Sequence, residues 1–427
     1  MTRTARYSIL TAAPLSQNAP RAWKALRLAF VLSLFFLTLV TAACNLTGGT
    51  GTTSTNGNGG NNGGGSTTPP PPPTVTPSAP NELPIMVSAG TGSGPSYNRP
   101  YVTVTICVPG TSNCQTIDNV VVDTGSTGLR LFSSVVTLPL SPQQATLGAT
   151  YSCFDFVTNY SWGPVVTADI QLSSELASGA SIQLMGDTTF AAPGNCSNGL
   201  PVFSSPQQAG FNGILGVWGL ADCSSSCSTG TLTYYWGCAS STCQPYPQAP
   251  AQPVSNPVSL FATDNNGLVF DMPGVLTTGQ ANVQGSLYFG IGTEANNQLG
   301  SATEYGLPMS TQINGVLYSV GMDTGTPILG YPNDALAGGL PLCGSYYCPS
   351  SPTNFDFVVV GSNSASFNVN ITAADATAGL QQGMTAFPEM VGPSGNTVML
   401  GFPFFYNMKI FVSWANPATG STSYVAF

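Results

Sequence analysis

The chain carries the same four-residue motif twice, and each copy contains an aspartate. Residues 123–126 read Asp-Thr-Gly-Ser, and residues 323–326 read Asp-Thr-Gly-Thr. Two carboxyl groups held a few ångströms apart cannot both ionise cheaply, so such a pair keeps one shared proton over a wide acid range. One of them accepts a proton from water while the other donates one, which is general acid–base catalysis of hydrolysis. Asp123 and Asp323 are therefore the candidate catalytic residues.

Each motif follows a segment that is typical of a β-strand. Residues 101–107 alternate apolar and polar side chains, as a half-buried strand does. After a Val-Pro-Gly turn, residues 117–122 are expected to return as a second strand that runs directly into Asp123. Residues 318–322 lead into Asp323 in the same way. The glycine two places after each aspartate lets the backbone turn sharply and approach its counterpart closely.

A second element recurs in the same order in both halves of the chain. It is an apolar pair followed by glycine, within residues 213–216 and again within residues 398–401, with 93 and 78 residues from aspartate to glycine. A duplication of so long a period predicts two similar lobes rather than a solenoid. We assign the N-terminal β lobe to residues 81–255 and the C-terminal β lobe to residues 256–427. The alternative is an unrelated β protein in which both motifs are simple turns.

The composition favours an all-β fold and excludes several kinds of chemistry. Glycine (49) and proline (35) are abundant, and only 6% of the residues are charged. The chain contains no histidine, which excludes Ser-His-Asp and Cys-His catalysis and any zinc site that needs imidazole. After Cys44, Lys409 is the only lysine, so Schiff-base chemistry has a single candidate. We expect no metal and no cofactor, and any hydrolysis to depend mainly on carboxylates.

Charge is divided sharply along the sequence. Five of the eight basic residues precede residue 28, whereas all 17 acidic residues follow Cys44 together with only three basic ones. So few cations cannot neutralise a row of phosphates, and nucleic acid is therefore not an expected partner.

Residues 1–43 are typical of a signal peptide. A basic stretch ends at Arg27 and precedes an apolar run over residues 28–40, which is shorter than the ~20 residues that a membrane-spanning helix needs. The run closes on Thr-Ala-Ala-Cys, which resembles a bacterial lipobox, although leucine is more usual three places before the cysteine. The resemblance implies that Cys44 is lipidated and becomes the mature N-terminus. The alternative is an ordinary signal peptide with Cys44 incidental.

Residues 44–80 are predicted to form a disordered linker. They are rich in glycine, threonine, asparagine and serine and contain a proline run, so they cannot bury enough apolar surface to fold. Such a linker would hold the folded part away from a membrane. We expect an exported, lipid-anchored protein of the bacterial cell envelope. Asn45 is not the aspartate associated with inner-membrane retention, which favours the outer membrane.

The cysteine count is odd, which is unusual for an exported protein. Setting Cys44 aside leaves ten of the eleven cysteines, enough for five disulfides. Three pairs are natural by position, namely Cys107 with Cys114, Cys153 with Cys196, and Cys343 with Cys348. The other four cysteines allow three connectivities, among which the sequence does not choose: Cys223, Cys227, Cys238 and Cys243.

The repeated elements resemble those of the pepsin-like (A1-type) aspartic proteases. The similarity covers most of residues 95–427 and includes residues 211–217, 285–290 and 400–406. It implies a two-lobed all-β fold with few short helices, a cleft between the lobes, and one catalytic aspartate from each lobe. More narrowly, the chain resembles a family of bacterial lipoproteins classed as a domain of unknown function, which carries no established activity.

The resemblance also assigns roles to the residues beside the aspartates. Two threonines would hydrogen-bond across the lobe junction, and the hydroxyls of two further residues would donate to the outer carboxylate oxygens. The supporting residues are Thr124, Gly125, Ser126, Thr324, Gly325 and Thr326, with Thr124 and Thr324 as the first pair and Ser126 and Thr326 as the second.

The hairpin that covers substrate in this family, the flap, is expected between Cys153 and Asp169. Its tip is predicted at residues 159–164, although the family's Tyr-Gly-x-Gly pattern is missing. Tyr160 or Trp162 would serve as the covering aromatic residue. The alternative is that each simply packs in the core.

A second departure from the family is Arg130, which stands where an aromatic residue is usual. Near the aspartates it would depress their pKa values and weaken the sharing of a proton. The alternative is that Arg130 pairs with a surface acid.

Two functions from different classes remain open. The first is a cell-envelope aspartic endopeptidase that acts on a peptide or protein substrate and is attached to the membrane through its N-terminal lipid. The second is a non-catalytic binding lipoprotein that holds a peptide or glycan between the lobes. Glycoside hydrolysis needs a wider carboxylate spacing and ranks below both. We expect a monomer in either case.

Overall fold

The computed structural model describes residues 77–92, 96–194, 196, 199–223, 234–246, 253–336 and 339–427. All of these residues belong to one compact unit, Pro72–Phe427. The predicted signal peptide, Cys44 and the predicted linker up to residue 76 lie outside the described residues. Within the described ranges, no helix is both long and apolar enough to cross a membrane.

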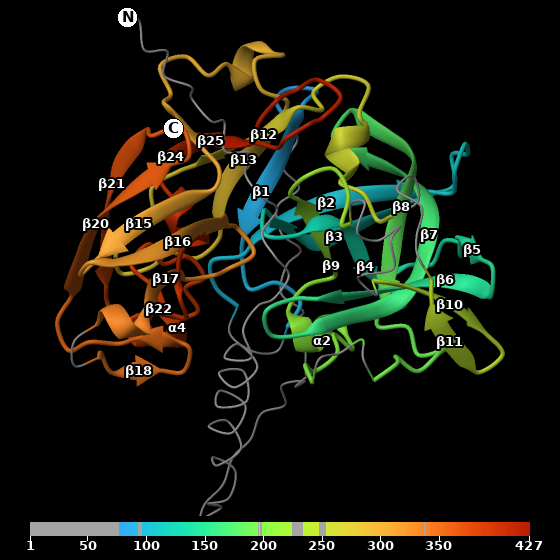
Figure 1. Cartoon of the computed structure of the whole chain (residues 1–427), viewed down its shortest axis with the longest axis horizontal. Coiled ribbons are helices and arrows are strands. Elements are labelled where there is room, and N and C mark those ends of the chain that lie inside the picture. The colour runs from blue at the N-terminus through green and yellow to red at the C-terminus, as the bar shows by residue number, and fades with distance from the viewer. Residues whose placement is uncertain are drawn as a thin grey trace, which may run out of the picture. The chain divides into compact units, whose positions relative to one another are not determined.

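Nearly all of the regular structure in the described residues is β-strand (Figure 1). The α-helices there are α2 (Pro206–Ala209) and α4 (Thr377–Gln381). The 3-10 turns are η1 (Ser133–Val135), η2 (Pro257–Leu260), η3 (Ala295–Asn297), η4 (Asn333–Ala335) and η5 (Phe402–Phe405). The predicted all-β fold with few short helices is therefore confirmed.

The larger of the sheets contains sixteen strands and draws on both halves of the sequence. The strands from the first half are β1 (Glu82–Val87), β2 (Pro100–Cys107), β3 (Cys114–Asp123), β4 (Thr127–Phe132), β5 (Gln144–Ala145), β6 (Gly148–Asp155), β7 (Tyr160–Leu172), β8 (Glu175–Met185), β9 (Gly213–Val217), β10 (Tyr235–Ala239) and β11 (Thr242–Pro245). The strands from the second half are β12 (Gly267–Met272), β13 (Val283–Phe289), β14 (Glu304–Gly306), β24 (Met408–Ser413) and β25 (Tyr424–Ala426).

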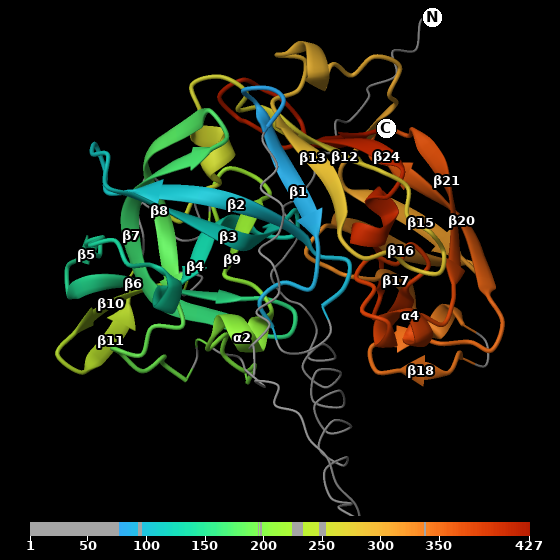
Figure 2. The ribbon, with the colours of Figure 1, turned by 180° about the vertical axis from the view of Figure 1, so that it is seen from behind.

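Strand β1 joins the two lobes. It pairs antiparallel with β13 along its whole length and with β2 at Met86 and Val87. Figure 2 shows β1 in blue beside the yellow strands β12 and β13, although almost two hundred residues separate them in the sequence. The first strand of the described chain is therefore built into the second half of the protein.

The second lobe has a sheet of its own, with the strand order β21-β20-β15-β16-β23-β17-β22. Its strands are β15 (Met309–Ile313), β16 (Val316–Asp323), β17 (Leu329–Pro332), β20 (Thr353–Gly361), β21 (Ser366–Ala373), β22 (Val391–Ser394) and β23 (Thr397–Gly401). A small hairpin of β18 (Leu342–Cys343) and β19 (Tyr346–Tyr347) lies beside it.

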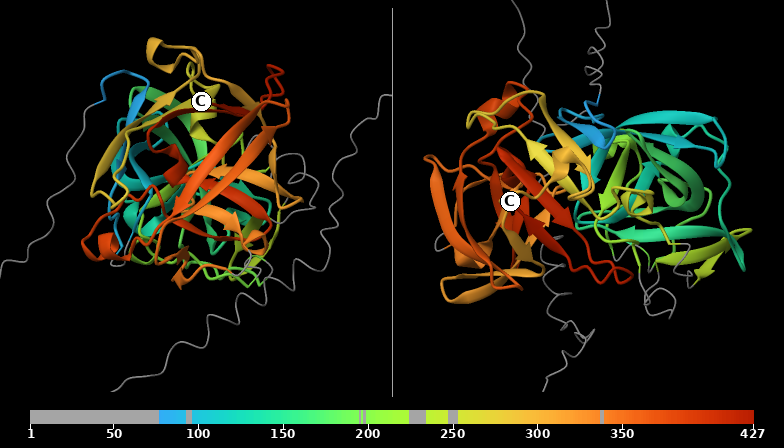
Figure 3. Two further views of the ribbon diagram at one scale, coloured as in Figure 1. Left: turned by 90° about the vertical axis from the view of Figure 1, so that its left-hand side faces the viewer. Right: turned by 90° about the horizontal axis from the view of Figure 1, so that it is seen from above.

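Burial follows the period of two that the strand assignments require. In β20 the side chains of Phe355, Phe357 and Val359 are buried, whereas Asp356 and Val358 face solvent. Strand β4 differs because all six of its residues are buried between neighbouring strands. One hydrophobic cluster continues through both lobes, whose strands Figure 3 shows from the side and from above.

Disulfides staple the hairpins and loops at the edges of the sheets. The predicted pairs Cys107–Cys114, Cys153–Cys196 and Cys343–Cys348 are all formed. A fourth disulfide, Cys238–Cys243, joins the hairpin of β10 and β11 and settles one part of the open connectivity. Cys223 is also disulfide-bonded, whereas Cys227 lies outside the described residues.

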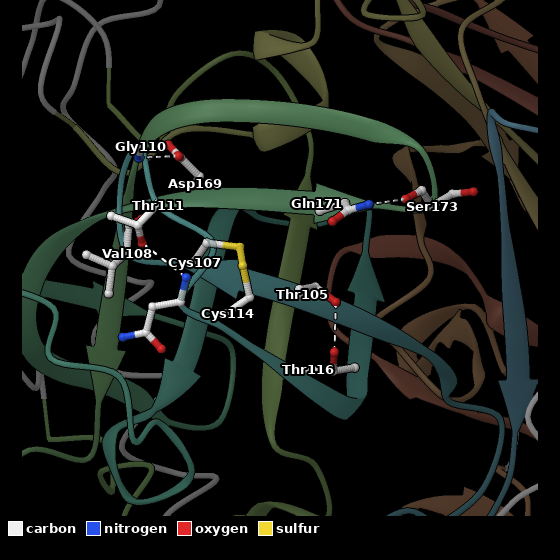
Figure 4. The surroundings of a disulfide bond; sticks show 11 residues. Thr105, Cys107, Val108, Gly110, Thr111, Cys114, Thr116, Asp169, Gln171 and Ser173 are labelled. Carbon is white, nitrogen blue, oxygen red and sulfur yellow. Dashed lines mark hydrogen bonds between the residues drawn. A yellow bond between two sulfur atoms is a disulfide. The ribbon is translucent and has the colours of Figure 1, made fainter.

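The turn beside Cys107 and Cys114 shows how these edges are held (Figure 4). The carboxylate of Asp169 on β7 accepts a hydrogen bond from the backbone N–H of Gly110 at 2.7 Å. Its other oxygen accepts one from the N–H of Gly179 at 2.7 Å. One carboxylate thereby holds both the turn between β2 and β3 and strand β8, which is a structural use of an acid outside the repeated motif.

Candidate active site

Asp123 is the last residue of β3, where the strand meets its neighbour β9. The two strands are parallel, and Gly216 of β9 lies opposite Asp123. Strand β9 also pairs antiparallel with β4, so the loop from β3 to β4 folds around it. Within that loop, the N–H of Gly125 donates to Oδ1 of Asp123 at 2.8 Å and the hydroxyl of Ser126 donates to Oδ2 at 2.5 Å. Both carboxylate oxygens are therefore held from their own loop.

The second lobe repeats this arrangement. Asp323 ends β16, and Gly401 of the parallel strand β23 lies opposite it. Strand β23 also pairs antiparallel with β17, the strand that follows the loop. The N–H of Gly325 donates to Oδ1 of Asp323 at 2.8 Å, and the hydroxyl of Thr326 donates to Oδ2 at 2.6 Å. The duplication visible in the sequence is thus a duplication of strand order, register and hydrogen bonding.

The two loops are tied to each other by their threonines. The N–H of Thr124 donates to the hydroxyl oxygen of Thr324 at 3.0 Å, and the N–H of Thr324 donates to that of Thr124 at 3.0 Å. Each hydroxyl in turn donates to a carbonyl of the opposite strand, that of Met322 at 3.0 Å and that of Val122 at 2.7 Å. Four reciprocal hydrogen bonds therefore fix the position of one loop relative to the other.

The glycines allow the loops to approach so closely. A Cβ atom at Gly125 would lie 2.7 Å from Oδ1 of Asp323, and a Cβ at Gly325 would lie 2.6 Å from Oδ1 of Asp123. Such contacts are shorter than van der Waals separation, so no side chain fits at either place. Each carboxyl group thus lies against the loop of the other lobe, and the structure brings both aspartates to one junction.

Burial and proximity change the acidity of the pair. Asp123 is 7% exposed. Burial, then the charge of Asp323 and a hydrogen bond with its carboxyl group, raise the pKa of Asp123 to about 8, against the opposing hydrogen bonds from Ser126 and Gly125. Asp123 therefore keeps its proton through the acid range. Among the described residues, no three His, Cys, Asp or Glu side chains gather closely enough to hold a metal ion.

Arg130 is fully buried, and its surroundings differ from both of the predicted ones. Its Nη2 forms an ion pair with Oδ2 of Asp222 at 2.8 Å, and neither side chain is exposed. Its Nη1 donates to the carbonyl of Thr127 at 2.5 Å, and the guanidinium lies 4.2 Å from the ring centroid of Phe154. The groups that shift the pKa of Asp123 do not include Arg130. The expectation of a surface acid as its partner is wrong, because the partner is a buried one.

The ion pair belongs to a network that joins three strands. The hydroxyl of Tyr235 donates to Oδ1 of Asp222 at 2.6 Å, and the N–H of Val254 donates to the oxygen of Tyr235 at 2.6 Å. Burial raises the pKa of Asp222 to about 6 although Arg130 and Tyr235 favour its ionised form. Nε of Arg130 has no hydrogen-bond partner within the described part of the chain. The network thereby connects β4, through Arg130, to β10 and to Phe154 of β6.

The hairpin predicted to cover substrate is formed by β6 and β7, but its tip lies earlier than expected. Asp155 pairs with Tyr160, and the N–H of Phe156 donates to the carbonyl of Asn159 at 2.8 Å. The turn is therefore 156–159, and all but the first residue of the predicted tip 159–164 belong to strand β7. The predicted and observed tips differ because the register between β6 and β7 determines where the turn lies, and the sequence does not reveal that register.

Of the two candidate covering residues, Trp162 packs inside the protein. It is 2% exposed, and its Nε1 donates to the carbonyl of Phe190 at 2.8 Å. Its ring lies 5.2 Å from that of Tyr151 and within the cluster around the disulfide Cys153–Cys196. Tyr160 is partly exposed at the first position of β7, next to the turn. The structure therefore removes Trp162 from the candidates and leaves Tyr160 near the tip.

One further residue of the junction has no recognisable signature in the sequence. Asn98 is fully buried, with a φ of 48°, and lies on the connection from β1 to β2. Its Nδ2 donates to the carbonyls of Pro327 at 2.9 Å and Phe387 at 3.0 Å, and its Oδ1 accepts from the N–H of Phe387 and the hydroxyl of Tyr406. A single asparagine in a loop carries no sequence pattern. It nevertheless ties the first lobe to the segment that follows Thr326.

Comparisons with known proteins found one family and similar solved structures. A family model described as "Protein of unknown function (DUF3443)" matches residues 77–427. Among solved structures, an aspartic proteinase from Irpex lacteus is similar, with 16% sequence identity and a TM-score of 0.48, over 81% of this chain and 96% of that chain. No curated protein sequence matches the chain.

Proposed function

The chain belongs to the family described as "Protein of unknown function (DUF3443)", and we propose that it is an aspartic-type endopeptidase that hydrolyses peptide bonds between Asp123 and Asp323. The observation that carries the proposal is the mirrored pair of loops. Each aspartate ends a strand, receives an N–H and a hydroxyl from its own loop, and lies against the glycine of the other loop. Turns of unrelated origin have no reason to share all of these features.

The proposed reaction uses the shared proton. The ionised carboxylate accepts a proton from a water molecule held between the two side chains, and the water attacks the scissile carbonyl carbon. The protonated carboxyl donates its proton to the carbonyl oxygen, and the pair then returns a proton to the leaving amine. The raised pKa of Asp123 supports this division, because it keeps the Asp123 carboxyl protonated at acidic pH.

The donors around each carboxylate support a fixed geometry rather than a mobile one. The hydroxyls of Ser126 and Thr326 hold the Oδ2 atoms, and the N–H groups of the two glycines hold the Oδ1 atoms. Preorganised groups lose little free energy when the transition state forms. The four hydrogen bonds of Thr124 and Thr324 support the same conclusion for the relative position of the lobes.

We place this activity at the bacterial cell envelope, on a lipid anchor at Cys44, with a peptide or protein as substrate. The lipobox-like sequence before Cys44 and the linker up to residue 80 support an anchored, outward-reaching protein. Growth with labelled palmitate tests the anchor. Label in the parent and none in Cys44→Ala is the expected result, and equal label in both would contradict it.

The activity itself is tested on an unfolded protein substrate from pH 3 to pH 8. The parent is compared with Asp123→Asn and with the control Asp356→Asn, which changes an exposed acid on β20. We expect cleavage by the parent and the control and none by Asp123→Asn, and we expect pepstatin-type inhibitors to block it. If the folded parent cuts nothing at any pH, the endopeptidase proposal fails and a binding protein with this fold remains.

A further inference from the structure

A polar pocket lies between the connection from β1 to β2 and helix α2. Gly92, Ser96 and Arg99 line it from the connection, and residues 207–210 line it from the helix and its C-terminal end. Its volume is about 130 Å³, which accommodates a group the size of a carboxylate with its adjoining carbons. Every residue of this lining is uncharged except Arg99.

The guanidinium of Arg99 is held in one orientation, but no carboxylate of the described residues forms an ion pair with it. Its Nη1 donates to the carbonyl of Ala209 at 2.6 Å, and its guanidinium lies 5.5 Å from the ring centroid of Phe211. In the described ranges the one ion pair joins Arg130 to Asp222, so no carboxylate there pairs with Arg99. A guanidinium has five N–H donors in a planar fork that matches a carboxylate.

Hydrogen bonds hold several described residues around the pocket in place. The carbonyl of Gly210 accepts hydrogen bonds from the N–H of Thr91 at 3.2 Å and from the hydroxyl of Tyr101 at 2.9 Å. The hydroxyl of Thr91 donates to the carbonyl of Pro206 at 3.1 Å. These residues therefore do not need to be ordered by a ligand, and less free energy is lost on binding.

The charge of the rest of the chain makes Arg99 unusual. After Cys44 there are three basic residues against 17 acids. Arg130 is buried in its ion pair, and Lys409 lies exposed on β24. The many acidic residues repel an anionic ligand from most of the protein. The positive charge of Arg99 therefore favours binding of an anion at this pocket.

Both walls of the pocket lead directly to the loops of the aspartate pair. Asn98, the residue before Arg99, donates to the carbonyl of Pro327, which follows the loop of Asp323. The chain that leaves the pocket at Gly210 enters β9, whose Gly216 lies opposite Asp123. The pocket and the aspartate pair are therefore connected through the same strands and loops.

We propose that this pocket binds a carboxylate of a peptide, through the guanidinium of Arg99. The carboxylate belongs either to an acidic side chain or to the C-terminus of the bound peptide. As a specificity subsite the pocket rests on the proposed function, whereas carboxylate binding by Arg99 does not. The two claims are therefore tested by separate measurements.

Carboxylate binding is tested on the full chain labelled with ¹⁵N-arginine. The Nε–H signal of Arg99 is the one that disappears in Arg99→Met. Three probes are titrated to about 100 mM, where binding of only ~1.4 kcal/mol is visible: N-acetylglutamate α-amide, N-acetylglutamine, and the neutral N-acetylglutamine α-amide. We expect the Arg99 signal to shift with at least one of the first two and not with the third. A shift with N-acetylglutamate α-amide indicates binding of a side-chain carboxylate, and a shift with N-acetylglutamine indicates binding of a C-terminal carboxylate. An equal response to all three, or none to any, overturns the proposal.

The role as a subsite is tested by cleavage of matched peptides that carry Glu or Gln at successive positions. We expect one position at which Glu is preferred roughly tenfold, a preference that weakens with salt and disappears in Arg99→Met. Lys409→Met removes the same charge from an exposed site and is expected to keep the preference. A preference that survives in Arg99→Met, or is lost equally in Lys409→Met, refutes the subsite. If the parent cuts no peptide, the proposed function fails, and the labelled-arginine titration still decides the pocket.

Discussion

Thr124 and Thr324 lie 200 residues apart, yet each donates its backbone N–H to the hydroxyl oxygen of the other at 3.0 Å. Each is adjacent in sequence to one of the paired aspartates. The contact that joins the lobes and the contact that positions the carboxyl groups therefore involve the same two loops. A substitution that disturbs the contact between the lobes is therefore expected to disturb the positions of the carboxyl groups as well.

Replacement of either threonine by valine tests this coupling. Thr124→Val keeps the shape of the side chain but leaves the N–H of Thr324 without its acceptor, which costs about 1–3 kcal/mol of unfolding free energy. Urea denaturation measures the loss, and cleavage assays should show reduced activity at the same time. The control is Thr116→Val, whose hydroxyl bonds Thr105 on the surface and should matter by less than about 0.5 kcal/mol. Equal stability of Thr124→Val and Thr116→Val would contradict the account.

The glycine of each loop should tolerate no side chain. In Gly125→Ala the new methyl group would lie 2.7 Å from Oδ1 of Asp323, so the carboxyl group must move. Displacement of a catalytic group by ~1 Å is expected to lower kcat/KM about 100-fold while the protein stays folded. Gly395→Ala provides the control because nothing lies within 4 Å of its added methyl group. Full activity of Gly125→Ala would show that the carboxyls are not so closely placed.

The pair also predicts how stability depends on pH. The pKa of Asp123 is raised from 3.8 to about 8, by burial first and then by Asp323, so the folded protein holds a proton that the unfolded chain releases. This contribution to stability is complete below about pH 4 and is lost as the pH rises toward 8, at about 1.4 kcal/mol per pH unit for one proton.

The measurement compares parent and Asp123→Asn by urea denaturation at several pH values from 4 to 8. The difference between them isolates the pair, because Asp222, whose pKa is also raised, is present in both. We expect the stability of Asp123→Asn relative to the parent to increase with pH. Parallel curves for the two proteins would mean that the carboxyls do not share a proton.

The buried ion pair offers a test of a different part of the structure. Arg130→Met or Asp222→Asn alone leaves a buried polar group without its partner, and each should cost about 3–5 kcal/mol. The double variant should lose clearly less than the sum of the two, because neither charge is then left alone. A double-mutant cycle by chemical denaturation at pH 7 gives the coupling. Additive losses would show that the pair contributes nothing as a pair.

The sequence predicted the aspartate loops well because the information there is local. Asp123 receives its hydrogen bonds from Gly125 and Ser126, two and three residues further along the chain. Asp323 receives its hydrogen bonds from the same positions of the second motif. The paired cysteines of close spacing were predictable for the same reason.

What the sequence did not reveal depends on contacts between distant residues. Arg130 meets Asp222 across 92 positions, and Asn98 meets Phe387 across 289. No spacing rule connects such residues. The tip of the hairpin was misplaced because register follows from pairing of Asp155 with Tyr160, and no glycine marks the turn. The pairing of Cys238 with Cys243 likewise follows from a hairpin whose register the residue types alone did not fix.

The central claim is that Asp123 and Asp323 act as one catalytic unit. Its most direct test is the rate of peptide cleavage by Asp123→Asn, Asp323→Asn and the double variant, each measured with protein in excess over substrate. Residues that act as a unit are strongly non-additive, so each single variant should lose activity about 1,000-fold or more, and the double variant should lose no more than either. Cleavage by either single variant at more than a tenth of the parent's rate would contradict the account.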